Sequence, residues 1–132
     1  MLRNALVVDD SPTIRLALRS MLQRAGIPEG GIVDADTGEM AVRLFGERNP
    51  DVVFLDIEMP GLDGEAVATE LLRVRPTAKL ILTTGLERND PRVRRLVSLG
   101  AFDVVEKPLR RERIEDVLRL LDESEREAGR IR

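Results

Sequence analysis

The sequence predicts a doubly wound α/β domain, in which a mainly parallel five-stranded sheet is covered by five helices. Two observations predict this class. Short apolar runs alternate along the chain with longer stretches of helical period, and the runs are continuous instead of alternating between apolar and polar residues. Alternation of strands and helices is typical of βαβ units, and continuous apolar strands are typical of a sheet that is buried on both faces.

Five apolar runs are predicted to be strands, at residues 5–8, 32–33, 52–55, 80–82 and 104–105. The run at 32–33 is the weakest of them. Each is short and lies between segments of helical period, as expected for parallel strands joined by helices.

Five apolar stripes with helical period follow the strands, over residues 14–25, 41–45, 67–74, 93–97 and 114–121. Ser11 followed by Pro12 has the pattern of a helix N-cap with proline at the first helical position. Gly26 and Gly100 follow the first and fourth stripes, where helices commonly end. We therefore expect one domain over residues 1–122, with residues 123–132 forming a charged C-terminal helix extension or tail.

The composition excludes several kinds of chemistry. The 132 residues include no cysteine and no histidine, so disulfides, thiolate metal sites and imidazole bases are excluded. The net charge of −3 does not fit a nucleic-acid-binding protein, and no segment is apolar enough for a signal peptide or a membrane span. We expect a soluble cytoplasmic protein whose chemistry uses carboxylates, hydroxyls and amines.

Acidic residues follow two of the predicted strands. Asp9 and Asp10 end the first strand, and Asp56 ends the third. Ligands of such sheets bind beyond the carboxyl ends of the strands, where these carboxylates would converge. Two carboxylates about 4 Å apart repel by roughly 4 kcal/mol at an effective dielectric near 20, so a cation or a proton is expected between them. If it is a cation, hard oxygen ligands favour Mg²⁺. The alternative is that Asp10 helps to cap the first helix while Asp9 is solvated.

Thr84 and Lys107 end the fourth and fifth strands and should face the same crevice. A metal ion, an ammonium and a hydroxyl donor around Asp56 are what a phosphoryl group on that carboxylate would need. Asp56 would then be a nucleophile that forms an acyl phosphate. Lys107 could instead be only a counter-ion, and Thr84 an ordinary residue at a strand end.

These residues resemble the receiver domain of two-component response regulators. The likeness covers about residues 3–121 and rests on Asp9-Asp10, the LDIEMPGLDG run around Asp56, Thr84-Gly85 and Lys107-Pro108, with Ala35, Gly38, Ala41 and Gly100-Ala101 in support. The resemblance implies a flavodoxin-like fold. The start of the chain, Asp10 to Arg15, is most similar to the stand-alone, chemotaxis-type subgroup.

The resemblance implies that Asp56 accepts a phosphoryl group from the phosphohistidine of a sensor kinase. It assigns Mg²⁺ to Asp9, Asp10 and Asp56 together with the backbone carbonyl of Glu58. The protein would be a signalling protein and not an enzyme, since it would promote only its own phosphorylation and dephosphorylation. A receiver without phosphorylation, acting as an interaction module, is the alternative.

The resemblance also implies that Lys107 pairs with the phosphoryl group, that Thr84 moves to donate a hydrogen bond to it, and that the peptide bond before Pro108 is cis. Its partners would be a sensor histidine kinase or phosphotransfer protein, which docks at the first helix, and a downstream target, with no nucleic acid and no membrane. A monomer or weak homodimer is expected. Separately from the resemblance, the last two helices carry many arginines, which could be an ordinary solvated face or a docking surface for an acidic partner or a second copy of the chain: Arg92, Arg94, Arg95, Arg110, Arg111 and Arg113.

One position departs from the family pattern. Many receivers carry an aromatic residue three positions before the lysine, where this chain has Val104. The period of a strand would place Phe102 on the same face as Val104, so Phe102 could partly replace the aromatic residue. Phe102 could equally be an ordinary core residue.

Two other classes of α/β protein fit the sequence less well. Phosphatases and phosphotransferases with an aspartyl nucleophile often have a second aspartate two residues later, where this chain has Glu58. A flavin- or nucleotide-binding domain needs a glycine-rich or hydroxyl-rich phosphate loop after the first strand, and here that segment is acidic.

Overall fold

The computed structural model describes residues 2–61 and 63–131 and confirms the predicted fold class. Five parallel strands form one sheet in the order β2-β1-β3-β4-β5. The strands are β1 (Ala5–Val8), β2 (Ile32–Ala35), β3 (Val52–Asp56), β4 (Leu80–Thr84) and β5 (Asp103–Glu106). The central strands β1, β3 and β4 are buried along their whole length, as their continuous apolar runs predict.

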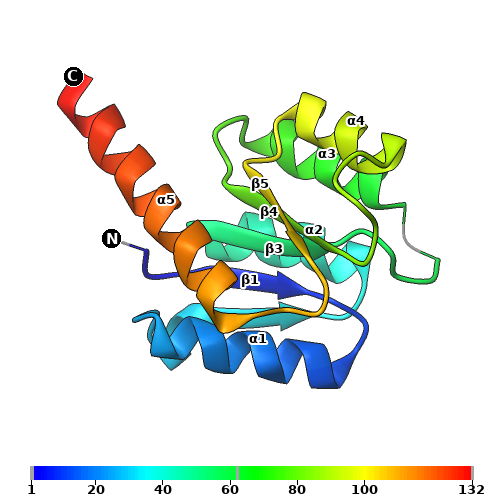
Figure 1. Ribbon diagram of the computed structural model, residues 1–132, viewed down its shortest axis with the longest axis horizontal. Coiled ribbons are helices and arrows are strands. Elements are labelled where there is room, and N and C mark those ends of the chain that lie inside the picture. Colours follow the sequence, from blue (N-terminus) through cyan, green and yellow to red (C-terminus); the bar gives the residue numbers. More distant parts are fainter. Residues whose placement is uncertain (1, 62, 132) are drawn as a thin grey trace.

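Helices cover both faces of the sheet (Figure 1). They are α1 (Pro12–Arg24), α2 (Gly38–Arg48), α3 (Gly64–Val74), α4 (Pro91–Leu99) and α5 (Arg111–Ile131), with a short 3₁₀ turn at Glu29–Gly31. Side chains of α2, α3 and α4 pack with one face of the sheet, and those of α1 and α5 pack with the other. Alternate residues of β1 enter the two cores, Leu6 and Val8 on one side and Ala5 and Val7 on the other.

Local signals in the sequence correspond to observed helix ends. Ser11 is the N-cap of α1, and its hydroxyl accepts a hydrogen bond from the Ile14 N–H at 3.3 Å. Three apolar residues of the predicted stripes, Ala25, Val74 and Val97, are exposed instead of buried in the core. Val74 and Val97 are 51% and 46% exposed, because the helices turn these positions away from the sheet.

The last helix continues beyond the apolar stripe that predicts it. α5 is a single helix to Ile131, and Figure 1 shows its C-terminal part projecting away from the rest of the domain. Ion pairs between neighbouring turns accompany this helix, for example Arg119 with Asp116 and Glu123. The division of the chain at residue 122 stays a prediction. Among the residues that the structure describes, no helix is both long and apolar enough to cross a membrane.

The strand register explains how distant residues reach one edge. Asp56 pairs with Thr83 across β3 and β4, and Thr84 pairs with Glu106 across β4 and β5. Because all five strands are parallel, their carboxyl ends meet on the same side of the domain. This edge carries the candidate site.

Candidate functional site

Asp56 is the last residue of β3 and is only 3% exposed. Its Oδ1 accepts a hydrogen bond from the backbone N–H of Glu58 at 2.9 Å, and its Oδ2 lies 3.1 Å from Nζ of Lys107. The apolar residues before it fill the core on both sides of the sheet, so the carboxylate is held by a rigid strand. The carboxylate has one backbone donor and one cation, a geometry that fixes its orientation.

Asp9, Asp10 and Asp56 form an acidic cluster in which one oxygen of each lies within 4.8 Å of the others. Asp9 is 2% exposed and accepts a hydrogen bond from the Ser11 N–H at 2.9 Å, whereas Asp10 is exposed. The alternative in which Asp9 is solvated and Asp10 caps the helix is therefore wrong, since Ser11 is the cap. Three hard oxygen donors with no nitrogen or sulfur ligand fit a cation such as Mg²⁺ or Ca²⁺.

Lys107 links the two buried carboxylates. Its Nζ lies 3.2 Å from Asp9 Oδ2 as well as 3.1 Å from Asp56 Oδ2. Its backbone N–H donates to the Thr84 carbonyl at 2.7 Å, and the Lys107–Pro108 peptide bond is cis, as the family resemblance implies. Burial acts to lower the pKa of Lys107, but its contacts with Asp56 and Asp9 outweigh burial and raise the pKa. The lysine is therefore fully charged in this crevice.

The pKa of Asp56 is raised above its ordinary value. Burial is the main cause, and it outweighs the Glu58 N–H and the Lys107 ammonium, which both lower the pKa. The negative charge of Asp9 raises it further. One ammonium does not fully offset two buried carboxylates, which is consistent with a site that takes a further cation.

Thr84 is fully buried at the end of β4, and its hydroxyl is bonded to Glu58. It donates a hydrogen bond to Oε1 of Glu58 at 2.7 Å, and the same oxygen accepts the backbone N–H of Gly85. These bonds lower the pKa of Glu58, with the Thr84 hydroxyl as the main cause. The hydrogen bonds of the Glu58 side chain with Thr84 and Gly85 were not predicted. The position of Glu58 just beyond the end of β3, the strand next to β4, was the available signal.

Arg15 lies on the first helix, where the resemblance implies that the phosphoryl donor docks, and it also contacts residues of the candidate site. Its guanidinium donates to the Asp9 carbonyl at 2.7 Å and lies 3.6 Å from Asp34 at the end of β2. Arg19, one turn later, pairs with the same Asp34 carboxylate at 2.8 Å. These contacts fix α1 against the edge that carries Asp9.

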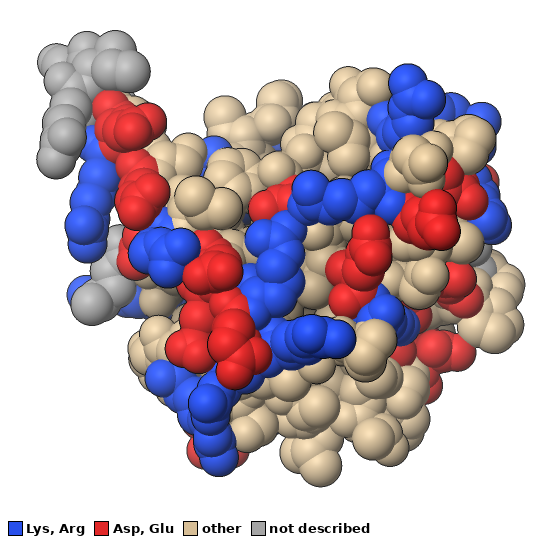
Figure 2. Space-filling model, in the orientation of Figure 1, with Lys and Arg blue, Asp and Glu red and all other residues tan. Residues whose placement is uncertain are grey.

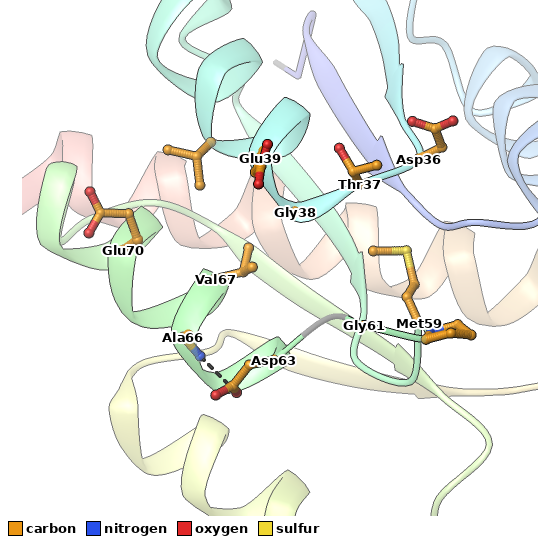
Figure 3. Close-up of a pocket in the computed structure, with 12 residues that line it drawn as sticks. Asp36, Thr37, Gly38, Glu39, Met59, Gly61, Asp63, Ala66, Val67 and Glu70 are labelled. Atoms are coloured by element: carbon orange, nitrogen blue, oxygen red, sulfur yellow. Dashed lines mark hydrogen bonds between the residues drawn. The ribbon is translucent and has the colours of Figure 1, made fainter.

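A hollow in the described surface lies apart from the acidic cluster. It has a volume of about 520 Å³ and lies between the starts of α2 and α3, next to the Met59–Gly61 segment (Figure 3). Asp63 borders it and caps α3 by accepting the Ala66 N–H at 3.1 Å. Leu62, which belongs to the LDIEMPGLDG run, lies outside the described residues.

The comparison with protein families shows which family this fold and these motifs belong to. Residues 5–119 match the family described as the response regulator receiver domain. The chain belongs to this family. The motifs at the ends of β1, β3, β4 and β5 are therefore those of a receiver, and the resemblance found from the sequence is confirmed.

Individual relatives agree with this assignment. The chain is 37% identical over 106 residues to a protein-glutamate methylesterase/protein-glutamine glutaminase of Pseudomonas aeruginosa. The aligned residues make up 80% of this chain and 30% of that protein. The chain thus spans about three-tenths of the length of such relatives. It is 30% identical over 116 residues to the chemotaxis protein CheY of Thermotoga maritima, covering 88% of this chain and 94% of the relative.

Solved structures show the same fold. A response regulator receiver domain protein from Clostridium thermocellum superimposes with a TM-score of 0.82 at 25% identity and covers 95% of this chain and 98% of its own. The CheY of a CheX-CheY-BeF3-Mg²⁺ complex from Borrelia burgdorferi has a TM-score of 0.79 at 29% identity, covering 88% of this chain and 86% of that one.

Val104, the position where the resemblance implies an aromatic residue, is buried in the core beneath α3 and α4. Phe102 does not share its face. It lies before β5 begins, packs with the core beneath α1 and α5, and has the Lys79 ammonium 5.3 Å from its ring centroid. The strand period does not extend to Phe102, so the predicted shared face is wrong. Phe102 and Val104 do border a common hollow of about 370 Å³ beside α4.

A second contact network lies on the outer edge of β5. Arg88, in the loop after β4, and Arg113, on α5, both donate to Asp103 Oδ1, at 2.7 and 3.0 Å. Both also donate to the Val104 carbonyl, at 3.1 and 2.9 Å. This network ties the loop after Thr84 to β5 and α5 of the receiver.

Proposed function

We propose that the chain is the phosphoacceptor of a two-component signalling pathway and that Asp56 is the residue phosphorylated. The observation that carries the proposal is the position of the Asp56 carboxylate, which is buried at a strand end, 3.1 Å from Lys107 and clustered with Asp9 and Asp10. Membership of the receiver family supports it. The cytoplasm, where sensor kinases present their phosphohistidine, is the proposed location.

In the proposed reaction, a carboxylate oxygen of Asp56 attacks the phosphorus of a phosphohistidine on a sensor kinase or phosphotransfer protein. The phosphorus–nitrogen bond breaks, and its electron pair leaves with the imidazole. Lys107 holds its charge next to the reacting oxygen and offsets the negative charge that gathers there. The Glu58 N–H keeps the carboxylate in one orientation.

We assign Mg²⁺ to the acidic cluster, with Asp9, Asp10, Asp56 and the Glu58 backbone carbonyl as the residues that would hold it. The donor chemistry fits, because all of these ligands are hard oxygens. When bound, the ion supplies neutralisation of phosphoryl and carboxylate charge. A Borrelia burgdorferi relative, solved as a complex with BeF3 and Mg²⁺, supports this assignment.

We further propose that the phosphorylated receiver signals by binding another protein. The residues 1–132 cover only the receiver part of the methylesterase relatives, so no esterase activity is proposed for them. The proposed output surface is the hollow beside α4 and β5, which Arg88, Arg94 and Val97 line. Figure 2 shows basic side chains gathered over α4 and mixed charges along α5. Such a surface fits an acidic partner.

The arginines that the sequence assigns to this surface differ in their availability. Arg92 pairs with Asp90, Arg95 with Glu65 and Arg113 with Asp103. No ion pair involves Arg94 within the described part of the chain, so it is the best single test. Arg94→Glu should weaken salt-sensitive partner capture by the phosphorylated chain, and unchanged capture would remove the surface.

The docking face for the phosphoryl donor is proposed on α1. Leu16 is 69% exposed, beside Arg15, whose guanidinium is already held by Asp9 and Asp34. An exposed leucine on the helix that follows Asp9 and Asp10 suits an apolar contact with a partner helix. Leu16→Glu should slow transfer from a kinase while leaving phosphorylation by a small donor unchanged.

The test of the proposed function is intact-mass measurement after incubation with Mg²⁺ and acetyl phosphate. We expect one phosphoryl adduct, which chelation of Mg²⁺ prevents and Asp56→Asn abolishes. Asp116→Asn, at an aspartate that pairs with Arg119 on α5, is the matched control and should keep the adduct. Absence of any Mg²⁺-dependent adduct would leave only the alternative, a receiver that acts as an interaction module without phosphorylation.

A further inference from the structure

The Glu58 side chain connects the loop after β3 with the start of the loop after β4. Glu58 lies in the loop after β3, and its Oε1 accepts hydrogen bonds from the Thr84 hydroxyl, at 2.7 Å, and from the Gly85 backbone N–H. The Thr84 oxygen in turn accepts the Leu86 N–H at 3.0 Å. The start of the loop after β4 is therefore tied to the loop that follows Asp56.

A threonine hydroxyl has a single hydrogen to donate. While that hydrogen is bonded to Glu58, Thr84 cannot donate to an oxygen of a phosphoryl group on Asp56. The Gly85 N–H is held by the same carboxylate oxygen, so the backbone next to Thr84 is held as well. Movement of Thr84 toward Asp56 requires both bonds to Glu58 to break.

Glu58 has little else to hold it. Lys107 pairs with Asp9 and Asp56, and no ion pair of the Glu58 carboxylate is present within residues 2–61 and 63–131. The residue is exposed, so water can solvate its carboxylate after the bonds break. Added negative charge on Asp56, two residues away, would also repel it. The bonds to Thr84 and Gly85 are therefore the contacts that hold the Glu58 carboxylate, and they can break without leaving a buried charge.

We propose that Glu58 is a positioning residue that holds Thr84 and Gly85 in the unphosphorylated arrangement by competing with the phosphoryl group for their donors. This inference rests on the proposed function, since it assigns a regulatory role at the same site. Removing the Glu58 carboxylate frees Thr84 in advance and so favours the phosphorylated arrangement. The coupling is reciprocal, so a phosphoryl mimic bound at Asp56 loosens the Glu58 contacts to the same extent.

The test compares beryllofluoride binding in saturating Mg²⁺ for the wild type, Glu58→Gln and Glu58→Ala, followed through the backbone amide signals of Gly85 and Leu86. Glu58→Ala should tighten the apparent dissociation constant by roughly fivefold or more, with Glu58→Gln in between. The matched control is Glu87→Ala. Glu87 is an exposed glutamate in the loop after β4, next to Leu86, and this variant should bind beryllofluoride as the wild type does.

Thr84→Ala separates a positioning role from a general effect of charge. If Glu58 acts through Thr84, the gain from Glu58→Ala should shrink by more than half in the Thr84→Ala background, because residues that share one interaction are not additive. An undiminished gain in that background, or no gain in the wild-type background, overturns the proposal. Failure of the wild type to bind beryllofluoride at all would overturn the proposed function as well, so the two failures are distinguishable.

Discussion

Asp56 and Glu58 are two residues apart, but the regions around them treat a negative charge in opposite ways. Around Asp56, burial dominates and raises the pKa of the carboxyl group in spite of Lys107. Around Glu58, donated hydrogen bonds from Thr84 and Gly85 dominate and lower the pKa. The nearby positive charge does not fully offset the burial of the Asp56 carboxylate, whereas hydrogen bonds already stabilise the charged form of the Glu58 carboxylate.

In the proposed mechanism, the region of Asp9 and Asp56 is fixed and the region of Thr84 is the one that switches. Asp56 and Asp9 extend from the buried central strands and are oriented by backbone N–H groups, so they need only a cation to be complete. Thr84 is bonded to the exposed Glu58 side chain and to its own loop. A ligand at Asp56 is therefore expected to rearrange the Thr84 region and to leave the Asp9 region in place.

The largest effect is expected from removing the Lys107 ammonium, which lies beside Asp9 and Asp56. Lys107→Ala should slow phosphorylation by acetyl phosphate by at least about 100-fold, the usual cost of losing one preorganised charge or donor. Lys79→Ala, at the other lysine of the chain, lies at the opposite end of β4 and should react at the wild-type rate. Intact-mass time courses measure both, and equal rates for Lys107→Ala and the wild type would contradict the assigned role.

Asp56→Asn should stabilise the protein in metal-free buffer. The folded state binds the Asp56 proton more tightly than the unfolded state does, because its pKa is raised. Stability from this group is complete below its ordinary pKa of about 3.9 and falls as the pH rises through the folded value. Thermal unfolding at neutral pH should therefore show a melting temperature a few degrees higher for Asp56→Asn.

Two conditions sharpen the stability test at Asp56. The advantage of Asp56→Asn should close in acid, below the ordinary carboxyl pKa, and it should shrink when Mg²⁺ is added to the wild type. A variant that is less stable than the wild type at neutral pH without metal would contradict the claim that burial dominates at Asp56.

Glu58→Gln should lower the stability of the folded state, the opposite of Asp56→Asn, and by a smaller amount. The pKa of Glu58 is lowered, so its contribution to stability is present above the ordinary value of about 4.3 and is lost as the pH falls through the folded value. Because the group is largely exposed, the loss at neutral pH should be below about 1 kcal/mol. Urea unfolding at several pH values measures it, and a loss that grows in acid would refute the sign.

The smallest effect is expected at Arg88, which ties the loop after β4 to Asp103 and to the Val104 carbonyl. Arg88→Ala should increase amide hydrogen exchange in this loop while changing global stability by less than about 1 kcal/mol. Arg92→Ala, which removes only a local pair with Asp90, is the control. If both variants exchange equally, the Arg88 contact does not restrain the loop.

Topology made the fixed region predictable. Parallel strands bring their carboxyl ends to one edge, so Asp9, Asp56 and Lys107 were placed together from apolar runs and the polar residues after them. The buried core before Asp56 leaves these side chains few alternatives. Cap positions such as Ser11 were predictable for a similar reason, because the signal and its structural consequence are adjacent in sequence.

The switching region was predicted less well. The partner of Thr84 depends on where the long Glu58 side chain extends after the chain leaves β3, and apolar periodicity carries no information on that path. Phe102 was misplaced because the two-residue period holds only within a strand, and β5 begins one residue later. Val97 was misplaced because apolar residues at the margin of a helical stripe can face solvent.

The most direct test of the central claim is chemical mapping of the phosphorylated residue in the wild-type chain. Borohydride reduces an aspartyl phosphate to homoserine, and the peptide between Arg48 and Val74 contains Asp51 and Asp63 as internal controls beside Asp56. The account predicts homoserine at position 56 alone, and only after treatment with both Mg²⁺ and a phosphoryl donor. Homoserine at position 51 or 63, or its absence from position 56, would contradict it.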